Sequence, residues 1–316
     1  MIIRNATATE LESYAQISDD PVRNRNYLGY VKVMLREGYT NPGWLFVAEA
    51  GGKVVARAGY WSLPHFQQPQ LLDLLILPWA GDYLAVGSQL LQESLTALHE
   101  RGAERLGFEL DLVPGDLAAA RERNQQAIIT AEAVGFQPSR QTLRFELTDM
   151  HAPISLPSRL TFRNLTTMGE EAFITAIARV SEGSLDRNVQ ASRAQLGARA
   201  AAGEHFMGMQ GFKHEPGWWQ LAYLPDGDLA GLVMPARNDG GPIIAYIGVV
   251  PEQRGKGYVD DLLAKGTAIL AASGAWRIRA DTDTQNAPMA AAFRRAGYKG
   301  FARRHEYTIR LPHDLR

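Results

Sequence analysis

The sequence contains no cysteine, no long apolar run and no excess of either charge. Without cysteine, the chain can form no disulfide, thiolate zinc site or cysteine nucleophile. No apolar stretch approaches the roughly 20 residues that a membrane-spanning helix needs. The 33 basic and 34 acidic residues nearly cancel, and no basic run favours a nucleic-acid partner. No signal peptide is visible at the N-terminus, so we expect a soluble cytoplasmic protein with neither a membrane nor a nucleic-acid partner.

The composition is that of a globular protein with ordinary cores, since 46% of the 316 residues are apolar. This length predicts about two domains of ~150 residues each. The seven histidines show no ligand spacing, so we predict no metal site. The segment 151–158 carries two prolines and two serines, which favours a linker. We therefore predict domains at 1–150 and 158–316.

The two halves repeat one series of strands and helices. Glycine turns, at Gly51-Gly52 in the first half and at Gly227 in the second, predict hairpins at corresponding places. The run Ile3-Arg4-Asn5-Ala6-Thr7 matches Phe162-Arg163-Asn164-Leu165-Thr166 at an offset of 159 residues. Asn124 and Asn286 each lie 11 residues before a glycine, at an offset of 162 residues. These near-constant offsets indicate an internal duplication.

The stretch 243–263 is the strongest candidate for a ligand site. An apolar strand at 243–250 ends at Pro251, and the loop Arg254-Gly255-Lys256-Gly257 leads into an amphipathic helix. A helix N-terminus behind a glycine loop binds anions, because its backbone N–H groups converge and the helix dipole is positive there. We therefore predict a phosphate-bearing ligand at this loop.

This loop, followed by Asn286, Met289 and Gly297-Tyr298, resembles two signatures of the GCN5-related N-acetyltransferase (GNAT) family. The resemblance covers about 159–311 and extends to 1–148 through the duplication. It implies an α/β fold of two tandem GNAT-like domains, each with a mixed, mostly antiparallel sheet flanked by helices. It also implies acetyl-CoA as co-substrate. The residues that it implies for acetyl-CoA binding are Val249, Val250, Arg254, Gly255, Lys256, Gly257, Tyr258, Val259 and Asn286.

The catalytic groups are less clear, because two positions depart from the family pattern. Residue 293, where the family usually carries a general-acid tyrosine, is Phe293, and the fourth strand of the second domain has no glutamate. Tyr258 or Tyr246 can protonate the departing thiolate, or it can leave unassisted. The resemblance favours Asp281 as general base, with Asp283 as second choice. Alternatively, both aspartates only cap the next helix or pair with nearby arginines.

The first half lacks the glycine loop. Its corresponding residues run from Trp79 to Gly87 without Arg-Gly-x-Gly, and Asp82 places a negative charge where a phosphate would bind. We therefore predict a degenerate first copy and a single acetyl-CoA site, in the second domain. The predicted function is acetyl transfer to a small-molecule or peptide amine by direct attack. The alternative is a non-catalytic acyl-CoA-binding or regulatory module. The sequence leaves the acceptor and the oligomeric state open.

Overall fold

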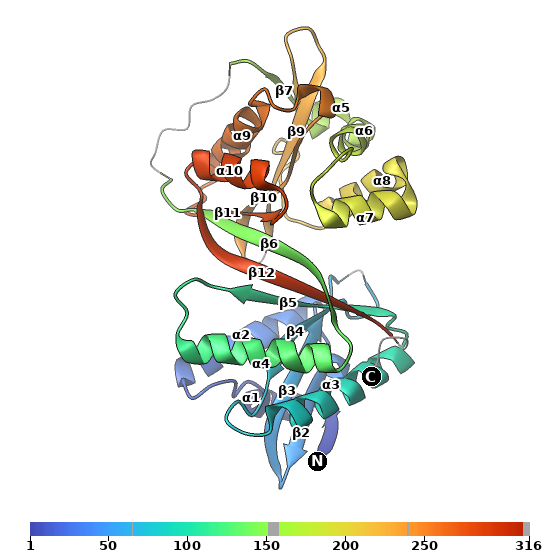
Figure 1. The fold of residues 1–316 in the computed structure, drawn as a ribbon, viewed down its shortest axis with the longest axis vertical. Coiled ribbons are helices and arrows are strands. Elements are labelled where there is room, and N and C mark those ends of the chain that lie inside the picture. The colour runs from blue at the N-terminus through green and yellow to red at the C-terminus, as the bar shows by residue number, and fades with distance from the viewer. Residues whose placement is uncertain (65, 151–157, 239, 312–316) are drawn as a thin grey trace. The chain divides into compact units, whose positions relative to one another are not determined.

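The computed structural model describes residues 1–64, 66–150, 158–238 and 240–311. They form two compact units, the first made of Met1–Ser139 with the chain from Arg304 on, the second of Arg140–Arg303. Each unit has a mixed, mostly antiparallel sheet flanked by helices, which confirms the predicted fold class (Figure 1). The predicted linker at 151–158 lies outside the described residues except for Ser158.

From their second strand on, the two halves of the chain have the same order of strands and helices; before it, the first half has two helices and the second half has four. In the first half they are β1 (Ile2–Asn5), α1 (Leu11–Tyr14), α2 (Pro21–Glu37), β2 (Leu45–Ala50), β3 (Lys53–Trp61), β4 (Leu71–Ile76), α3 (Tyr83–Glu100), β5 (Arg105–Leu112), α4 (Ala118–Ala133) and β6 (Gln137–Leu147). In the second half they are β7 (Thr161–Asn164), α5 (Leu165–Met168), α6 (Glu170–Val180), α7 (Arg187–Leu196), α8 (Ala198–Gln210), β8 (Gln220–Tyr223), β9 (Leu229–Asn238), β10 (Gly241–Val249), α9 (Tyr258–Ala272), β11 (Ile278–Asp283), α10 (Ala287–Arg295) and β12 (Lys299–Arg310). The shared order supports the duplication.

The sheet of the first unit has the strand order β1-β2-β3-β4-β5-β12, and that of the second β6-β11-β10-β9-β8-β7. Parallel pairing joins β4 to β5 and β10 to β11. The predicted hairpin between β2 and β3 is present, and its turn uses Gly51 and Gly52 at φ of 56° and 75°. Only glycine adopts such angles freely, so these two residues set the register of the hairpin.

Both faces of the sheet in the second unit are covered by helices. Along β9, Leu232 and Met234 pack with α6 and α8, whereas Val233 faces α9 and α10 (Figure 1). This alternation follows from the two-residue period of a strand. The core is therefore two-layered, and the sheet that carries the candidate loop is buried on both sides.

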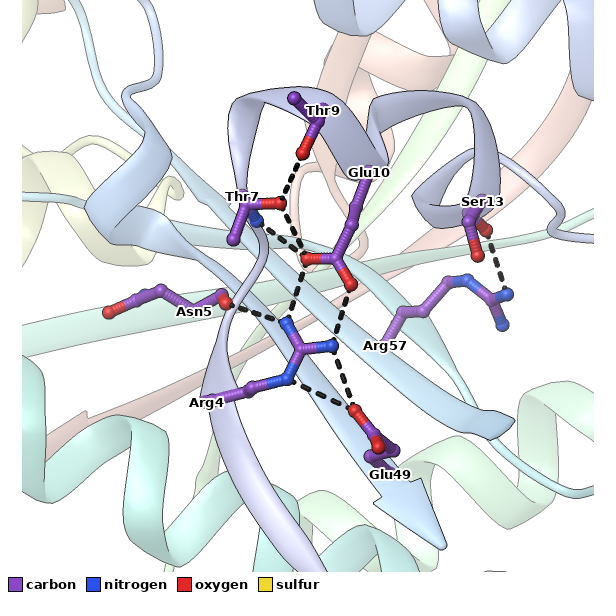
Figure 2. A network of polar contacts seen from close by, with 8 residues as sticks. All are labelled: Arg4, Asn5, Thr7, Thr9, Glu10, Ser13, Glu49 and Arg57. Atoms are coloured by element: carbon purple, nitrogen blue, oxygen red, sulfur yellow. Dashed lines mark hydrogen bonds and ion pairs between the residues drawn. The ribbon is translucent and has the colours of Figure 1, made fainter. Parts of the chain in front are cut away.

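A polar network closes the N-terminal end of the first unit (Figure 2). The Thr7 N–H donates to Glu10 at 2.9 Å, and Arg4 bridges Glu10 at 2.6 Å and Glu49 at 2.8 Å. Hydrogen bonds from Arg4, and then from Thr7, lower the pKa of Glu10 to about 2. The pairing thus joins β1, the following turn and β2 through one guanidinium.

The two halves exchange their last strands. Strand β6, from the first half, pairs with β11, so that Leu147 lies opposite Ile278 and Thr142 opposite Asp283. Strand β12, from the second half, lies beside β5, where the Leu311 N–H donates to the Glu104 carbonyl at 2.8 Å.

The two units therefore differ from the predicted division at 150 and 158. Segment 140–147 belongs to the second unit and the chain from Arg304 on to the first. The reason is physical, because a strand pairs with whichever sheet edge completes its buried face, and local sequence patterns carry no information about that partner.

Within the described ranges, no helix combines the length and apolar character needed to cross a membrane. The same residues contain no cluster of three or more histidine, aspartate or glutamate side chains arranged to hold a metal ion.

The strand exchange predicts which unit each of two phenylalanines stabilises. Phe145, on β6, is 1% exposed and lies 5.2 Å from the Phe293 ring, whereas Phe136 is 0% exposed in the core of the first unit. Replacing either by alanine leaves a large cavity and costs about 3–5 kcal/mol. We expect Phe145→Ala to speed amide exchange in α9 and α10, and Phe136→Ala to speed it in α3. If Phe145→Ala instead speeded amide exchange in α3 and left α9 unchanged, the assignment of β6 to the second unit would be wrong.

Candidate active site

The candidate site begins where β10 and β11 separate. The two strands are paired in parallel at Ile243 and Arg279 and, within these fully described strands, at no later position. Beyond this point β10 stays paired with β9, and β11 with β6. A bulge between Ile244 and Tyr246 turns β10. The result is a gap in the sheet whose walls are backbone edges of two strands.

Backbone groups of β10 line this gap. The Val250 N–H donates to the Ala230 carbonyl on β9 at 3.0 Å. Because successive N–H groups of a strand point in opposite directions, the Val249 N–H faces away from β9 and toward the gap. Of the two valines that the sequence places here, only Val249 offers its N–H to a ligand.

The loop after β10 ends in a helix N-terminus with no side-chain cap. Gly255 and Gly257 take positive φ of 77° and 79°, and Gly257 occupies the N-cap position of α9 without a side-chain hydrogen bond to the first helical amides. Around Gly255 nothing lies within 4 Å of where a Cβ would stand. Open N–H groups and the positive end of the helix dipole favour an anion at this point, and the anion cradle that the sequence predicts here stays a prediction.

The charged side chains of the loop have distinct roles. Arg254 donates to the carbonyls of Val180 at 3.0 Å, Glu182 at 2.5 Å and Val249 at 3.2 Å, so its guanidinium ties the loop to the end of α6. Lys256 is exposed and donates to Gln253 at 2.8 Å. Lys256 is thus placed to meet a phosphate, whereas Arg254 holds the loop in shape.

Two acidic residues in the first turn of α9 are balanced by arginines. Asp261 pairs with Arg159 at 2.5 Å, and Asp260 pairs with Arg295 at 2.8 Å. The Arg159 guanidinium also lies 4.9 Å from the centre of the Tyr258 ring. Tyr258 and Val259 are half-buried at the start of the helix. Their backbone amides belong to the cradle, and the Tyr258 side chain lies at the loop end of the site.

The aspartates of β11 are held by arginines of β6. Asp281 is exposed and accepts from the Arg144 Nε at 3.2 Å. Asp283 is buried, and it accepts from the Gln285 N–H at 2.9 Å and from the Arg140 Nε at 3.4 Å. Asp283 thus has a structural role ahead of α10. Asp281 is the better placed of the two to receive a proton, because solvent reaches its carboxylate.

Two further predicted positions lie in and before α10. The Asn286 side-chain oxygen accepts from the Met289 N–H at 3.2 Å, which caps α10. Phe293 is 1% exposed and packs between Phe145 and Tyr298 at ring distances of 5.2 and 5.5 Å. A tyrosine at this position would have to bury its hydroxyl, which explains physically why an apolar ring stands here.

A histidine–tyrosine pair at the bulge was not identified from sequence. His205, on α8, lies 4.3 Å from the Tyr246 ring, and its Nε2 is buried with no hydrogen-bond partner among the described residues. Burial lowers the pKa of His205 and raises the pKa of Tyr246 above its usual range, and the charge of Asp186 raises both. His205 has no motif around it, so only its spatial contact with the bulge could have indicated it.

In the first unit, the helix N-terminus at the corresponding loop is capped by an aspartate side chain. Asp82 is the N-cap of α3, and its carboxylate accepts from the Ala85 N–H at 3.3 Å. Negative charge therefore already occupies the helix N-terminus where the second unit presents free amides. The contrast supports a single anion cradle.

Comparison with known proteins agrees with this geometry. Residues 192–298, which lie within the second unit, match the model of the acetyltransferase (GNAT) family. No curated protein matches the sequence.

Solved structures match nearly the whole chain. A GCN5-related N-acetyltransferase from Sphaerobacter thermophilus superposes with a TM-score of 0.65 at 16% identity, covering 98% of this chain and 95% of that one. A tandem GNAT protein from the clavulanic acid biosynthesis pathway superposes with a TM-score of 0.57 at 14% identity, and the match covers 98% of each chain. A glucosamine N-acetyltransferase region of a fungal β-N-acetylglucosaminidase superposes with a TM-score of 0.59 at 15% identity. That match covers 97% of this chain but 38% of the fungal chain.

Identities this low establish the fold and leave the substrate open. The family match covers the segment with the open strands and the glycine loop, and the whole-chain similarities include a tandem protein. This chain therefore has a tandem GNAT fold, and residues 192–298 of its second unit match the GNAT acetyltransferase family model.

Proposed function

We propose that the second unit is an acetyl-CoA-dependent N-acetyltransferase that moves an acetyl group to a small-molecule or peptide primary amine. One observation carries the proposal: an uncapped helix N-terminus with two positive-φ glycines stands at the end of a strand that has separated from its neighbour. A long ligand with a pyrophosphate at one end and amide groups along its arm matches this arrangement of backbone donors.

The residues present fit such a ligand. The amides from Gly255 to Val259 would hold the pyrophosphate, with exposed Lys256 beside it. The Val249 N–H and the open edge of β10 would hydrogen-bond the pantetheine arm, and the Asn286 side-chain nitrogen can donate to it. Bound there, acetyl-CoA would supply an activated thioester, whose developing oxyanion a strand N–H can stabilise.

Acetyl transfer to an amine requires one group that accepts a proton, and it can proceed without a strong acid to protonate the leaving thiolate. A primary amine with a pKa near ~10 is mostly protonated at neutral pH, so a base must first free its lone pair. The amine nitrogen then bonds to the thioester carbon, the carbon–sulfur bond breaks, and the thiolate leaves. We propose Asp281 as the base, directly or through water. Tyr258 and Tyr246 are the hydroxyls proposed to protonate the sulfur, and Tyr246 is the one at the bulge.

Binding of acetyl-CoA tests the cradle. Gly257→Ala adds a Cβ at φ of 79°, at the open N-terminus of α9, and Gly274→Ala makes the same change at φ of 80°, at the far end of that helix. Both changes strain the backbone by about 1–2 kcal/mol. We expect Gly257→Ala to weaken acetyl-CoA binding at least tenfold in calorimetric titration, and Gly274→Ala to leave it within twofold of the wild type. Equal affinities of the two variants would place the pyrophosphate elsewhere.

Release of CoA tests the reaction. With a panel of primary amines, we expect turnover by the wild type and a loss of about 10²-fold or more in kcat/KM for Asp281→Asn, the size of a general-base effect. Asp226→Asn, in the β8–β9 turn, is the matched control and should keep full activity.

The possible outcomes separate the two candidate functions. Tight acetyl-CoA binding without turnover on any amine would favour the non-catalytic acyl-CoA-binding module. No binding at all would refute both. Turnover that Asp281→Asn leaves unchanged would move the base to another group.

A further inference from the structure

An open hollow lies between the end of α6 and helix α7 in the second unit. Its volume is ≈ 320 Å³, at the lower end of the range of about 300–1,000 Å³ that small-ligand sites cover. The residues that line it are Ser181, Gly183, Ser184, Gln190, Arg193 and Ala194. Among these described residues Arg193 alone carries a charge. The hollow is therefore a polar, cationic surface with room for a small ligand.

Arg193 uses one of its three nitrogens to hold the end of α6. Its Nη1 donates to the Ala178 carbonyl at 2.7 Å and to the Ser181 hydroxyl at 2.8 Å. The last carbonyls of a helix lack intrahelical partners, so this contact fixes the guanidinium in place. The Nε and Nη2 of Arg193 have no hydrogen-bond partner among the described residues. They are also not among the buried atoms that lack one, so solvent reaches them.

The two unpartnered nitrogens form the edge of the guanidinium that suits a carboxylate. The Nε–H and one Nη2–H lie in one plane and point the same way, so together they can donate to both oxygens of a carboxylate. Ser184 stands nearby on the wall of the hollow. Its hydroxyl oxygen accepts from the Asp186 N–H at 3.2 Å and donates its own proton to no described residue. The hollow thus offers fixed donors to a planar anion.

The other charges around the hollow leave this positive charge uncancelled. Arg254 directs all three of its nitrogens at backbone carbonyls, one of them the Gly183 carbonyl at 3.4 Å. It therefore adds a second positive charge at the rim but has no edge left for an anion. Of the nearby carboxylates, Asp186 caps α7 and pairs with an arginine of β6, and the Glu182 side chain is exposed outside the lining.

The hollow lies beside the strand edge that we propose for acetyl-CoA. Ser181 follows Val180, and Val180 packs directly on β10, because a Cβ on Gly248 would lie 2.9 Å from the Val180 Cβ. At the bulge of β10, burial raises the pKa of the Tyr246 hydroxyl, and the charge of Arg193 is one of those that lower it. Arg193 is therefore within electrostatic range of the bulge.

We propose that the acetyl acceptor is a primary amine that also carries a carboxylate, and that the Nε–Nη2 edge of Arg193 binds this carboxylate in the hollow. The amine of the bound acceptor then extends toward the bulge of β10. The substrate class is that of small amino acids, in preference to uncharged or purely cationic amines. This inference rests on the proposed acetyl transfer, although the carboxylate site can be tested by binding alone.

The binding test is an NMR titration of the full-length protein with ω-amino acids of increasing length, from glycine to 6-aminohexanoate, at constant ionic strength. The corresponding amides, which keep the amine and lack the carboxylate, are the neutral counterparts. The Nε–H signal of Arg193 reports on the hollow, and the indole N–H signal of Trp276, 69% exposed after α9, is the internal reference. We expect a saturable shift of Arg193 with at least one acid, at least tenfold weaker binding of its amide, and no shift of Trp276.

Equal affinity for acid and amide in the wild type, or no saturable response to any acid, would overturn the proposal without recourse to a variant. Arg193→Gln removes the charge and the bidentate edge, and it should weaken binding of the tightest acid at least tenfold. The matched control is Arg199→Gln, which removes an exposed guanidinium that pairs with Glu171, and it should change this affinity less than twofold. Unchanged affinity in folded Arg193→Gln would also overturn the proposal.

Turnover separates this inference from the proposed function. With acetyl-CoA, the wild type should show at least tenfold higher kcat/KM for the acid than for its amide, and Arg193→Gln should lose this preference through a higher KM for the acid. Equal kcat/KM for acid and amide would overturn the carboxylate site and leave acetyl transfer standing. Binding of the acid at Arg193 without CoA release from any amine would refute acetyl transfer, and with it the acid as acceptor, while supporting the carboxylate site.

Discussion

The parting of β10 from β11 is the constraint on which the candidate site depends. Each strand keeps its outer neighbour, β9 or β6, so neither loses its place in the sheet when the inner pairing stops after Ile243 and Arg279. Unpaired strand edges inside a protein are costly unless something binds them. In this unit the edges end at a glycine loop and an uncapped helix. The proposed acetyl-CoA site combines these unpaired edges with the loop and the helix N-terminus.

The two units share a framework of strands but carry different side chains at two equivalent positions. Both have a bulge at the point where two parallel strands part, yet the first carries Asp73 there and the second lies beside Tyr246. The helix that follows is capped by Asp82 in the first unit and left open by Gly257 in the second. A duplicated fold can diverge in this way without any change in its strand order.

Most of the fold could be predicted from the sequence because its signals are local. Glycine turns, apolar strands and the loop before α9 each depend on residues adjacent in the chain, and the structure contains all of them. The strand exchange depends on Phe145 and its neighbours finding a core more than 100 residues away, and no local pattern encodes that choice. The same limit applies to Arg254, whose guanidinium donates to four backbone carbonyls, and to the contact between His205 and Tyr246.

The most direct measurement is the response of backbone amides to acetyl-CoA in NMR spectra of the full-length protein. A cradle at the start of α9 predicts shifts and slowed solvent exchange for the amides of Gly255 to Val259 and for Val249. It predicts little change for Trp79 to Asp82, where the first unit is capped by its own carboxylate. Changes confined to Trp79–Asp82, or none at either loop under saturating acetyl-CoA, would contradict it.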